Sequence, residues 1–578
     1  MSGRVRLTTV VSVGVLLIAA TSKASTIPVP AGGDLQQAIN GAQAGDTIAL
    51  PPGATFSGGF TLPVKSGDAW ITIRTSGESG LPGDGGRISP ANADALAKIQ
   101  QAPGVPAFAT AAGAHHWRLS LLEIIGNGGS DMITLGNGSS AQQSLSQVPH
   151  DLVVDRVYMH GGAGGQKRGI ALNSASTTIT GCYISEIKLE GQDSQAVLGW
   201  NGPGPFTLSN NYFEAATENV MFGGADPSIP GLVPSDITIA DNQFAKQPAW
   251  RGQSWLIKNL LELKNARRVT IVRNTFDYTW ENGQSGFAIL FTVRNQDGGC
   301  PWCQVDHVTF EQNVVRHAGA GVEMLGFDDN NPSQQTNTIV VRNNIFADID
   351  SDRWGGNGYF VSIAGGPRDV TFDHNTVISD HGSGIVSMDG PPVLGFRFTN
   401  NLMKHNAYGF HGSGRGIGND SIAAYLPGAI VSRNVMAGGS ATQYPPDNSF
   451  PTPAQFESQF VSYAGGDYRL IPDSPWRGAG ADGEDLGAVF GGGGGAPNPP
   501  RRPMQPIEGE GTISDGPVGG TGCPLLSFMV STYVVKVDES TEFVNGSCTT
   551  LRLGTLIHGR GIVNDDGTVS LSYLAIIQ

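Results

Sequence analysis

The chain carries little charge, and its charges are not gathered in one place. Only 15% of the 578 residues are Asp, Glu, Lys or Arg, against about 25% in an average globular domain. The net charge is −15, and no cluster of Lys and Arg stands out, so the surface would repel a phosphate backbone. These absences argue against a nucleic-acid partner, and we expect none.

Long apolar runs are also missing from the body of the chain. No stretch after the N-terminal segment reaches the about 18 apolar residues that a membrane-spanning helix needs. The run Val10 to Ala20 is shorter, follows Arg4 and Arg6, and precedes the small-x-small triplet Ser22-Lys23-Ala24. This order is typical of a signal peptide. We expect residues 1–24 to be removed and the mature chain to be secreted or extracytoplasmic, without a membrane span.

Cysteine is scarce, with five residues in the whole chain. Cys300 and Cys303 form a close pair in a predicted turn. A zinc site would need a second pair nearby, and a thioredoxin-like site would need a βαβ setting; neither is visible. A local disulfide fits an exported protein. Cys523 and Cys548 could pair near the C-terminus, which leaves Cys182 as a buried, unreactive thiol.

What the sequence does have is a repeated segment. Alternating β segments with an Asn at a fixed place recur as ITIADNQF, VTIVRNTF, VTFEQNVV and VTFDHNTV, at a period of roughly 25 to 39 residues. Such a period predicts units that bury their apolar side by stacking. Stacked Asn amides would hydrogen-bond along the stack and satisfy buried turns. The expected Asn column is Asn210, Asn242, Asn274, Asn313, Asn343, Asn375, Asn400 and Asn434.

The units carry no helical spacing, which favours one coil of short strands per repeat. Residues 34–39 predict a short capped helix that covers the open apolar end of the stack. Together with Ala44-Gly45-Asp46 and Pro52-Gly53, this segment resembles the N-terminal cap of the pectate-lyase-like proteins. The resemblance implies an all-β fold: a right-handed parallel β-helix over residues 26–490, with a short N-terminal capping helix.

A Gly- and Pro-rich linker is expected over residues 491–504. The final segment, 505–578, has alternating strands and turns at Asn545-Gly546 and Asp566-Gly567. It resembles a small bacterial OB-like β-barrel of unknown function, and we expect an accessory domain.

Charged residues at outward strand positions gather in the coils that also carry long insertions. Strand alternation places the leucines of Leu261-Glu262-Leu263-Lys264 in the core, with Glu262 and Lys264 facing solvent. Glu323 faces outward two coils further on, roughly 9.6 Å away along the stack. Arg294 lies outward between them, and Glu218 lies one coil before Glu262. These coils form the candidate cleft.

Two enzymatic interpretations follow. In a lyase, calcium held by Glu218, Asp226 and Glu262 would bind a uronate carboxylate. Lys264 or Arg294 would then act on the neighbouring ring proton, with Lys264 the better base. In an inverting hydrolase, Glu262 and Glu323 would serve as acid and base, since their separation is near the about 6.5 to 9.5 Å required.

The same residues also allow a simpler interpretation, because outward Glu and Lys on a sheet commonly form cross-strand ion pairs. Trp200, Trp250 and Trp302 are candidates for stacking on sugar rings, or else anchors for long loops. The Arg-x-Pro-x-x-Arg segment of typical pectate lyases and the polygalacturonase motifs are missing.

We therefore expect a monomeric exported protein that acts on an extracellular polysaccharide, as a lyase or a hydrolase, with calcium as a possible cofactor. A non-catalytic glycan-binding or adhesion protein and a purely structural protein remain the alternatives.

Overall fold

The computed structural model describes residues 24–489, 505–515, 526–530, 533–538, 541–563 and 569–577. The predicted linker and all but the last residue of the predicted signal peptide lie outside this part of the chain. No helix in the described residues is both long enough and apolar enough to cross a membrane.

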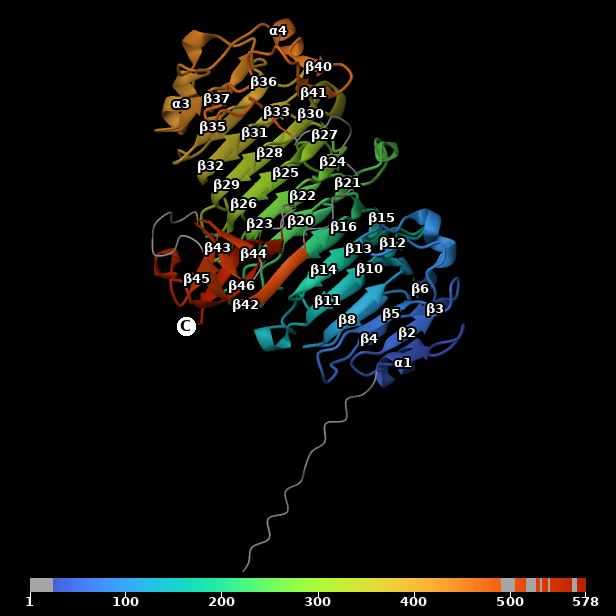
Figure 1. Cartoon of the computed structure of the whole chain (residues 1–578). Helices are drawn as coiled ribbons and strands as arrows, with labels where there is room; N and C mark the ends of the chain where they lie inside the picture. The colour runs from blue at the N-terminus through green and yellow to red at the C-terminus, as the bar shows by residue number, and fades with distance from the viewer. Residues whose placement is uncertain are drawn as a thin grey trace, which may run out of the picture.

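Three long parallel sheets wind around one core and form the predicted right-handed parallel β-helix (Figure 1). Sheet A contains β1 (Thr26–Pro28), β2 (Thr47–Leu50), β5 (Ile71–Thr75), β8 (His115–Ser120), β11 (His150–Asp155), β14 (Thr177–Thr180), β17 (Phe206–Ser209), β20 (Ser235–Ala240), β23 (Ala266–Val272), β26 (Val305–Glu311), β29 (Asn337–Arg342), β32 (Arg368–Asp373), β35 (Arg397–Thr399) and β38 (Ile430–Ser432).

Each coil adds one strand to the next two sheets as well. Sheet B contains β3 (Thr55–Gly58), β6 (Ala97–Gln101), β9 (Leu122–Ile125), β12 (Tyr158–His160), β15 (Tyr183–Ile187), β18 (Tyr212–Ala215), β21 (Gln243–Ala245), β24 (Thr275–Asp277), β27 (Val314–Ala318), β30 (Ile345–Ile349), β33 (Thr376–Val377), β36 (Leu402–Lys404) and β39 (Val435–Ala437). Sheet C contains β4 (Phe60–Leu62), β7 (Phe108–Thr110), β10 (Gly128–Gly136), β13 (Gln166–Asn173), β16 (Gln195–Gly199), β19 (Val220–Phe222), β22 (Leu261–Leu263), β25 (Phe287–Thr292), β28 (Ala320–Leu325), β31 (Tyr359–Ala364), β34 (Gly384–Asp389) and β37 (Phe410–Gly412).

The coils stack in register, so that like side chains meet inside. Phe213, Phe244 and Phe276 occupy equivalent positions of β18, β21 and β24. Their rings lie 5.3 Å and 4.4 Å apart, and all three are fully buried. One continuous apolar core therefore runs the length of the coil, which no single repeat could form alone.

The corner between sheets A and B holds the predicted Asn ladder. The backbone N–H and the Nδ2 of Asn242 both donate to Oδ1 of Asn274, at 2.9 Å and 3.0 Å, and Nδ2 also donates to the Leu208 carbonyl at 2.8 Å. The same bonds recur from coil to coil. The ladder consists of Asn211, Asn242, Asn274, Asn313, Asn344, Asn375, Asn401 and Asn434, all buried, and ends on Asn448.

Three positions of the predicted column were wrong by one residue. Asn210, Asn343 and Asn400 precede the ladder residues and have φ of 53°, 55° and 57°. The corner needs a residue in the left-handed region just before each ladder Asn, and Asn tolerates that conformation well. Where two Asn stand in a row, the sequence pattern does not show which one points inward.

Cys182 takes the ladder position in the coil before Asn211. Its Sγ accepts from the N–H of Val157 at 3.5 Å and donates to the Val154 carbonyl at 3.4 Å, while its N–H donates to Oδ1 of Asn211 at 2.9 Å. Burial raises the pKa of this thiol to about 12, as expected for an unreactive cysteine.

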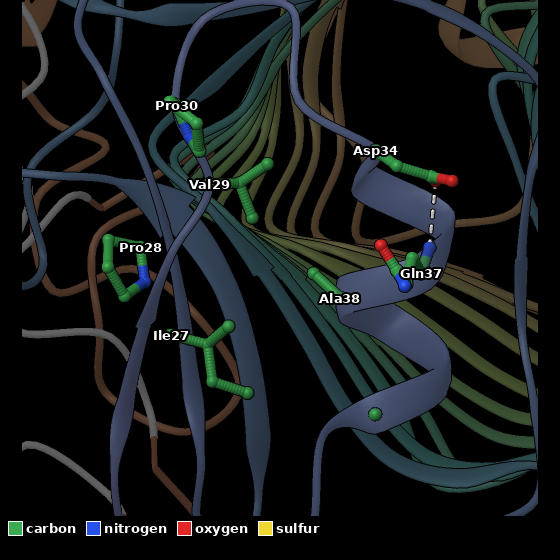
Figure 2. Close-up of a pocket in the computed structure, with 8 residues that line it drawn as sticks. Ile27, Pro28, Val29, Pro30, Asp34, Gln37 and Ala38 are labelled. Atoms are coloured by element: carbon green, nitrogen blue, oxygen red, sulfur yellow. Dashed lines mark hydrogen bonds between the residues drawn. The ribbon is translucent and has the colours of Figure 1, made fainter.

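The N-terminal end is closed by the predicted helix, α1 (Leu35–Gly41) (Figure 2). The Asp34 carboxylate accepts from the N–H of Gln37 at 2.9 Å and caps the helix. Leu35 and Ile39 are buried on the core side. The remaining α-helices in the described residues are α2 (Ser351–Trp354), α3 (Asn419–Tyr425) and α4 (Pro453–Glu457), and β40 (Phe460–Ser462) pairs with β41 (Asp467–Leu470) after the last coil.

The C-terminal unit is a separate barrel-like sheet with its own core. It contains β42 (Gln505–Asp515), β43 (Leu526–Val530), β44 (Tyr533–Val537), β45 (Glu542–Val544), β46 (Leu556–Val563) and β47 (Val569–Ile576), and β44 also pairs with β47. Arg268 of β23 lies 3.4 Å from Glu542 of this unit. Cys548 is disulfide-bonded, and its expected partner, Cys523, lies outside the described residues.

Candidate functional site

Four of the predicted site residues, Glu218, Glu262, Lys264 and Glu323, lie on or beside the outer face of sheet C, around β19, β22, β25 and β28. Glu262 stands beside Met221 on one side and Leu290 on the other, and Leu290 stands beside Glu323. Glu262 and Glu323 therefore point outward from coils two steps apart, as predicted. This separation corresponds to about 9.6 Å along the stack.

Glu262 does not face open solvent as predicted, because it is only 2% exposed. Its Oε2 accepts from Nδ2 of Asn259 at 2.9 Å, and its Oε1 accepts from the Thr292 hydroxyl at 3.2 Å. Nζ of Lys264 lies 3.4 Å from the same Oε1. Burial raises the pKa of Glu262, the nearby Glu218 raises it further, and Lys264 only partly opposes this. The carboxylate is enclosed by Asn259, Thr292 and Lys264, contacts that the strand pattern does not reveal.

Glu218 is fully buried just before β19. Its Oε2 accepts from Nε2 of Gln195 at 2.9 Å, and its Oε1 lies 3.3 Å from Nζ of Lys258. Burial works to raise the pKa of Glu218, but Lys258, the Gln195 hydrogen bond and Lys264 outweigh it and lower the pKa. Two buried carboxylates thus lie close together with opposite shifts, a pattern that often marks a functional site.

The backbone on both sides of Glu218 is held by hydrogen bonds from the buried side chain of Lys246. Nζ of Lys246 donates to the carbonyls of Ala215, Ala216 and Thr217 and to Oδ1 of Asn219, with distances of 2.9 Å to Ala215 and 2.9 Å to Asn219. Lys246 is 1% exposed, and burial lowers its pKa to about 7. Four oxygen partners fix the backbone on both sides of Glu218.

The exposed part of the site is formed by Lys264, Glu323 and Arg294. Lys264 and Glu323 are both partly exposed. Burial raises the pKa of Glu323, Glu262 raises it further, and Arg294 opposes the shift. The Arg294 guanidinium is engaged by Asp328 at 3.1 Å and by Asp329, so it is not a free cation beside the glutamates.

The predicted calcium trio does not assemble. Oδ2 of Asp226 accepts from the N–H groups of Asp297 and Gly299, at 3.1 Å and 2.7 Å, and so joins two loops. Glu218 and Glu262 already face Lys258 and Lys264. No group of three His, Cys, Asp or Glu side chains in the described residues is arranged to hold a metal ion. The residues present do not fit the predicted cation site.

The predicted disulfide joins Cys300 to Cys303 in the loop after β25. The N–H of Cys300 donates to Oδ1 of Asn295 at 2.7 Å, and Asn295 is itself bonded to Pro332 and Asp328. The disulfide therefore lies in a loop that Asn295 links by hydrogen bonds to the loop containing Asp328 and Pro332.

The three candidate tryptophans have different surroundings. Trp250 is only 4% exposed, in an apolar cluster with Trp280 and Ile257, so the structure contradicts a sugar-stacking role for it. Trp200 and Trp302 are partly exposed. Their ring N–H groups donate to the carbonyls of Gly138 and Leu232, at 2.9 Å and 3.1 Å, and fasten each ring to a neighbouring loop.

Sequence reasoning missed the residues that hold the glutamates. Gln195 begins β16, whereas Lys258 and Asn259 lie side by side just before β22, and the three contact Glu218 or Glu262. Lys246 carries at most a weak sequence signal as a lysine directly after β21, because Lys188 follows β15 in the same way. The remaining three have none: Gln195 is one polar residue at the start of β16, and Lys258 and Asn259 lie in a loop whose length differs from those of the other coils.

Sequence comparison finds no matching protein-family model and no matching curated protein. Several solved structures match at low identity. The PL6 family alginate lyase AlyGC is 12% identical, with 74% of this chain and 53% of that chain covered and a TM-score of 0.46. A mannuronic acid specific polysaccharide family 6 lyase from human gut microbiota is 12% identical, with 75% and 93% covered and a TM-score of 0.40.

A family 28 exopolygalacturonase of Yersinia enterocolitica is 10% identical, with 74% of this chain and 78% of that chain covered and a TM-score of 0.35. This chain spans about half the length of AlyGC. At such identities the matches concern the fold alone, so the site must be judged on its own geometry.

Proposed function

We propose that the protein is an exported enzyme that cleaves an acidic polysaccharide by β-elimination on the outer face of sheet C. One observation carries the proposal: the partly exposed Lys264 ammonium lies 3.4 Å from the buried Glu262 carboxylate, two coils from Glu323. The three groups are a base, its partner and an acid on one face. The solved polysaccharide lyases of similar fold are consistent with this chemistry.

Each residue has a defined role in this elimination. Glu262 positions the Lys264 side chain, whose Nζ lies 3.4 Å from Oε1 of Glu262, and the step uses Lys264 in its neutral amine form. Lys264 then removes the ring proton next to the uronate carboxyl group, and a carbon–carbon double bond forms as the glycosidic C–O bond breaks. Glu323, whose pKa is also raised, donates a proton to the leaving oxygen.

A second candidate function is inverting hydrolysis. It is favoured by the raised pKa of Glu323, which suits a general acid, and by the spacing of about 9.6 Å at the backbone between Glu262 and Glu323. An inverting pair needs about 6.5 to 9.5 Å between carboxyl groups. In this mechanism Glu323 protonates the leaving oxygen and Glu262 activates a water molecule.

Neither mechanism uses calcium, because the residues present do not fit the predicted site. Calcium dependence stays a prediction from the sequence alone. Assaying the enzyme with added calcium and with a chelator tests it directly.

The decisive experiment incubates the mature protein with a panel of uronate polymers. Ultraviolet absorbance of an unsaturated product and the number of new reducing ends are recorded together. Elimination raises both signals, whereas hydrolysis raises the reducing ends alone. Lys264→Ala should abolish elimination. Lys98→Ala is the matched control, since Lys98 makes a similar ion pair with Glu123 on sheet B.

No signal on any polymer would overturn the enzymatic proposal. Retention of the protein on an immobilised polymer would then favour the non-catalytic glycan-binding alternative.

A further inference from the structure

The outward column that contains Glu262 and Glu323 continues beyond the candidate site. Ser362 of β31, Ser387 of β34 and His411 of β37 follow Glu323 in register on successive coils. All four side chains are partly exposed. We call Glu323, Ser362, Ser387 and His411 the polar strip.

The groups of the polar strip are free to bind a ligand. Within the described residues, the side chains of Ser362, Ser387 and His411 take part in no hydrogen bond or ion pair, and neither does Glu323. Many charged groups elsewhere on the outer faces are paired, as in the two hydrogen bonds between Arg268 and Asp236. The strip combines unpaired hydroxyl, carboxyl and imidazole groups in one line, whereas the aligned Thr207, Thr238, Thr270 and Thr309 of sheet A offer hydroxyl groups alone.

The same column changes character on the other side of Glu262. Met221, Leu198 and Ala171 occupy it and are 5%, 6% and 1% exposed. A hydrophilic chain would gain no hydrogen bonds there. The free polar surface thus extends from the candidate site in one direction only, toward β37, the last strand of sheet C.

Spacing and an exposed ring suggest the kind of ligand. Successive groups of the strip are about 4.8 Å apart along the stack, a distance similar to the advance of a polysaccharide per sugar unit. Tyr408 is 48% exposed, and its ring lies 5.4 Å from that of His411. An exposed aromatic face beside hydrogen-bonding groups suits a sugar ring, which has an apolar face and polar edges.

We propose that the polar strip binds the sugar units on one side of the bond that is cleaved, with Tyr408 stacking on the last of them. The polysaccharide then lies parallel to the helix axis and runs from Glu323 toward β37. Ser362 and Ser387 exchange hydrogen bonds with sugar hydroxyls, and His411 binds a hydroxyl or carboxylate. This inference rests on the proposed function and adds the direction and extent of the binding site.

The test compares long and short ligands. Titration calorimetry measures the affinity of a uronate hexamer and dimer for the full chain carrying Glu262→Gln, which prevents turnover. Ser387→Trp, which blocks the strip, should weaken hexamer binding about tenfold or more and leave dimer binding within about twofold. Ser387→Ala should weaken hexamer binding about threefold through one lost hydrogen bond. Thr371→Trp, on the half-buried outer face of β32 in sheet A, is the matched control.

The outcomes separate the two proposals. If the native enzyme cleaves a uronate polymer but both Ser387 variants bind the hexamer as tightly as the control does, the polar strip is not the binding site and the proposed function stands. If no oligomer binds and no polymer is cleaved, both proposals fall.

Discussion

The Asn ladder and the candidate site are built by the same coils but follow opposite rules. At the corner between sheets A and B, one residue type repeats, and each Asn is satisfied by the next. On the outer face of sheet C, one column changes from Met221 to Glu262, Leu290 and Glu323 in consecutive coils. The residue that every coil needs for its corner is repeated, whereas the column that holds the candidate site changes from coil to coil.

The two regions also differ in their electrostatics. The ladder buries neutral amides whose donors and acceptors are all paired, which favours stability. The site buries two carboxylates close together and raises the pKa of Glu262, which costs stability. This contrast predicts that ladder substitutions lower stability, whereas removing the charge of Glu262 removes activity and not stability.

Glu262→Gln tests the site side of the comparison most strongly. Turnover should fall about a hundredfold or more with the loss of an acid–base group. Because the folded state raises the pKa of Glu262, its contribution to stability is largest below the unfolded-state pKa and falls as pH rises through the folded-state value. Gln has no such loss, so the urea midpoint of the variant should exceed that of the native chain at neutral pH, and the gain should vanish in acid. An active or uniformly destabilised variant would contradict the assignment.

Asn313→Ala tests the ladder side. Asn313 is fully buried; its Oδ1 accepts twice from Asn274, and its Nδ2 donates to Ile271 and Asn344. Removing it leaves several buried groups without partners and should lower the free energy of unfolding by about 3 kcal/mol or more. Gln312→Ala, at the half-buried preceding residue, is the control and should change the urea midpoint little. Equal effects at the two positions would refute the ladder's role.

Lys246→Met tests whether the buried lysine that binds the backbone around Glu218 supports the candidate site. Loss of the ammonium leaves carbonyls around Glu218 without donors and should cost about 2 kcal/mol. Burial lowers the pKa of Lys246 to about 7, so between that value and the unfolded-state pKa the unfolded chain holds the extra proton and stability rises with pH. The advantage of the native chain over Lys246→Met in urea should therefore grow from about pH 7 to about pH 10. A pH-independent difference would show that Lys246 does not titrate there.

Cys182→Asn has the smallest expected effect. It adds one more Asn to the ladder, in the coil before Asn211, and so tests whether the ladder stabilises the fold. Cys182 already accepts from Val157 and donates to Val154, the bonds that an Asn makes in the next coils. Stronger amide hydrogen bonds should raise the free energy of unfolding by up to about 1 kcal/mol. Thermal or urea unfolding measures it, and a clear loss of stability would mean that this coil is too narrow for the amide.

Much of the fold could be predicted from the sequence. The Asn period, the alternation within each repeat and the Asp34-capped helix predicted the β-helix and its N-terminal end. Strand alternation also placed Glu262 and Glu323 outward, two coils apart. The site was predicted less well, because strand alternation gives the direction of a side chain but not what covers it. Glu262 therefore proved buried, and Trp250 proved to be a packing residue.

The sequence by itself determined the coil, because the repeated alternation leaves stacking as the only way to bury each apolar face. It also determined that Glu262 and Glu323 share a column, because the period fixes the register. Only the tertiary structure decided which of two adjacent Asn residues enters the ladder, that Asp226 bonds to a loop some seventy residues away, and that Lys246 lies beneath Glu218. These depend on loops of unequal length, whose contacts follow from packing in three dimensions and leave no period in the chain.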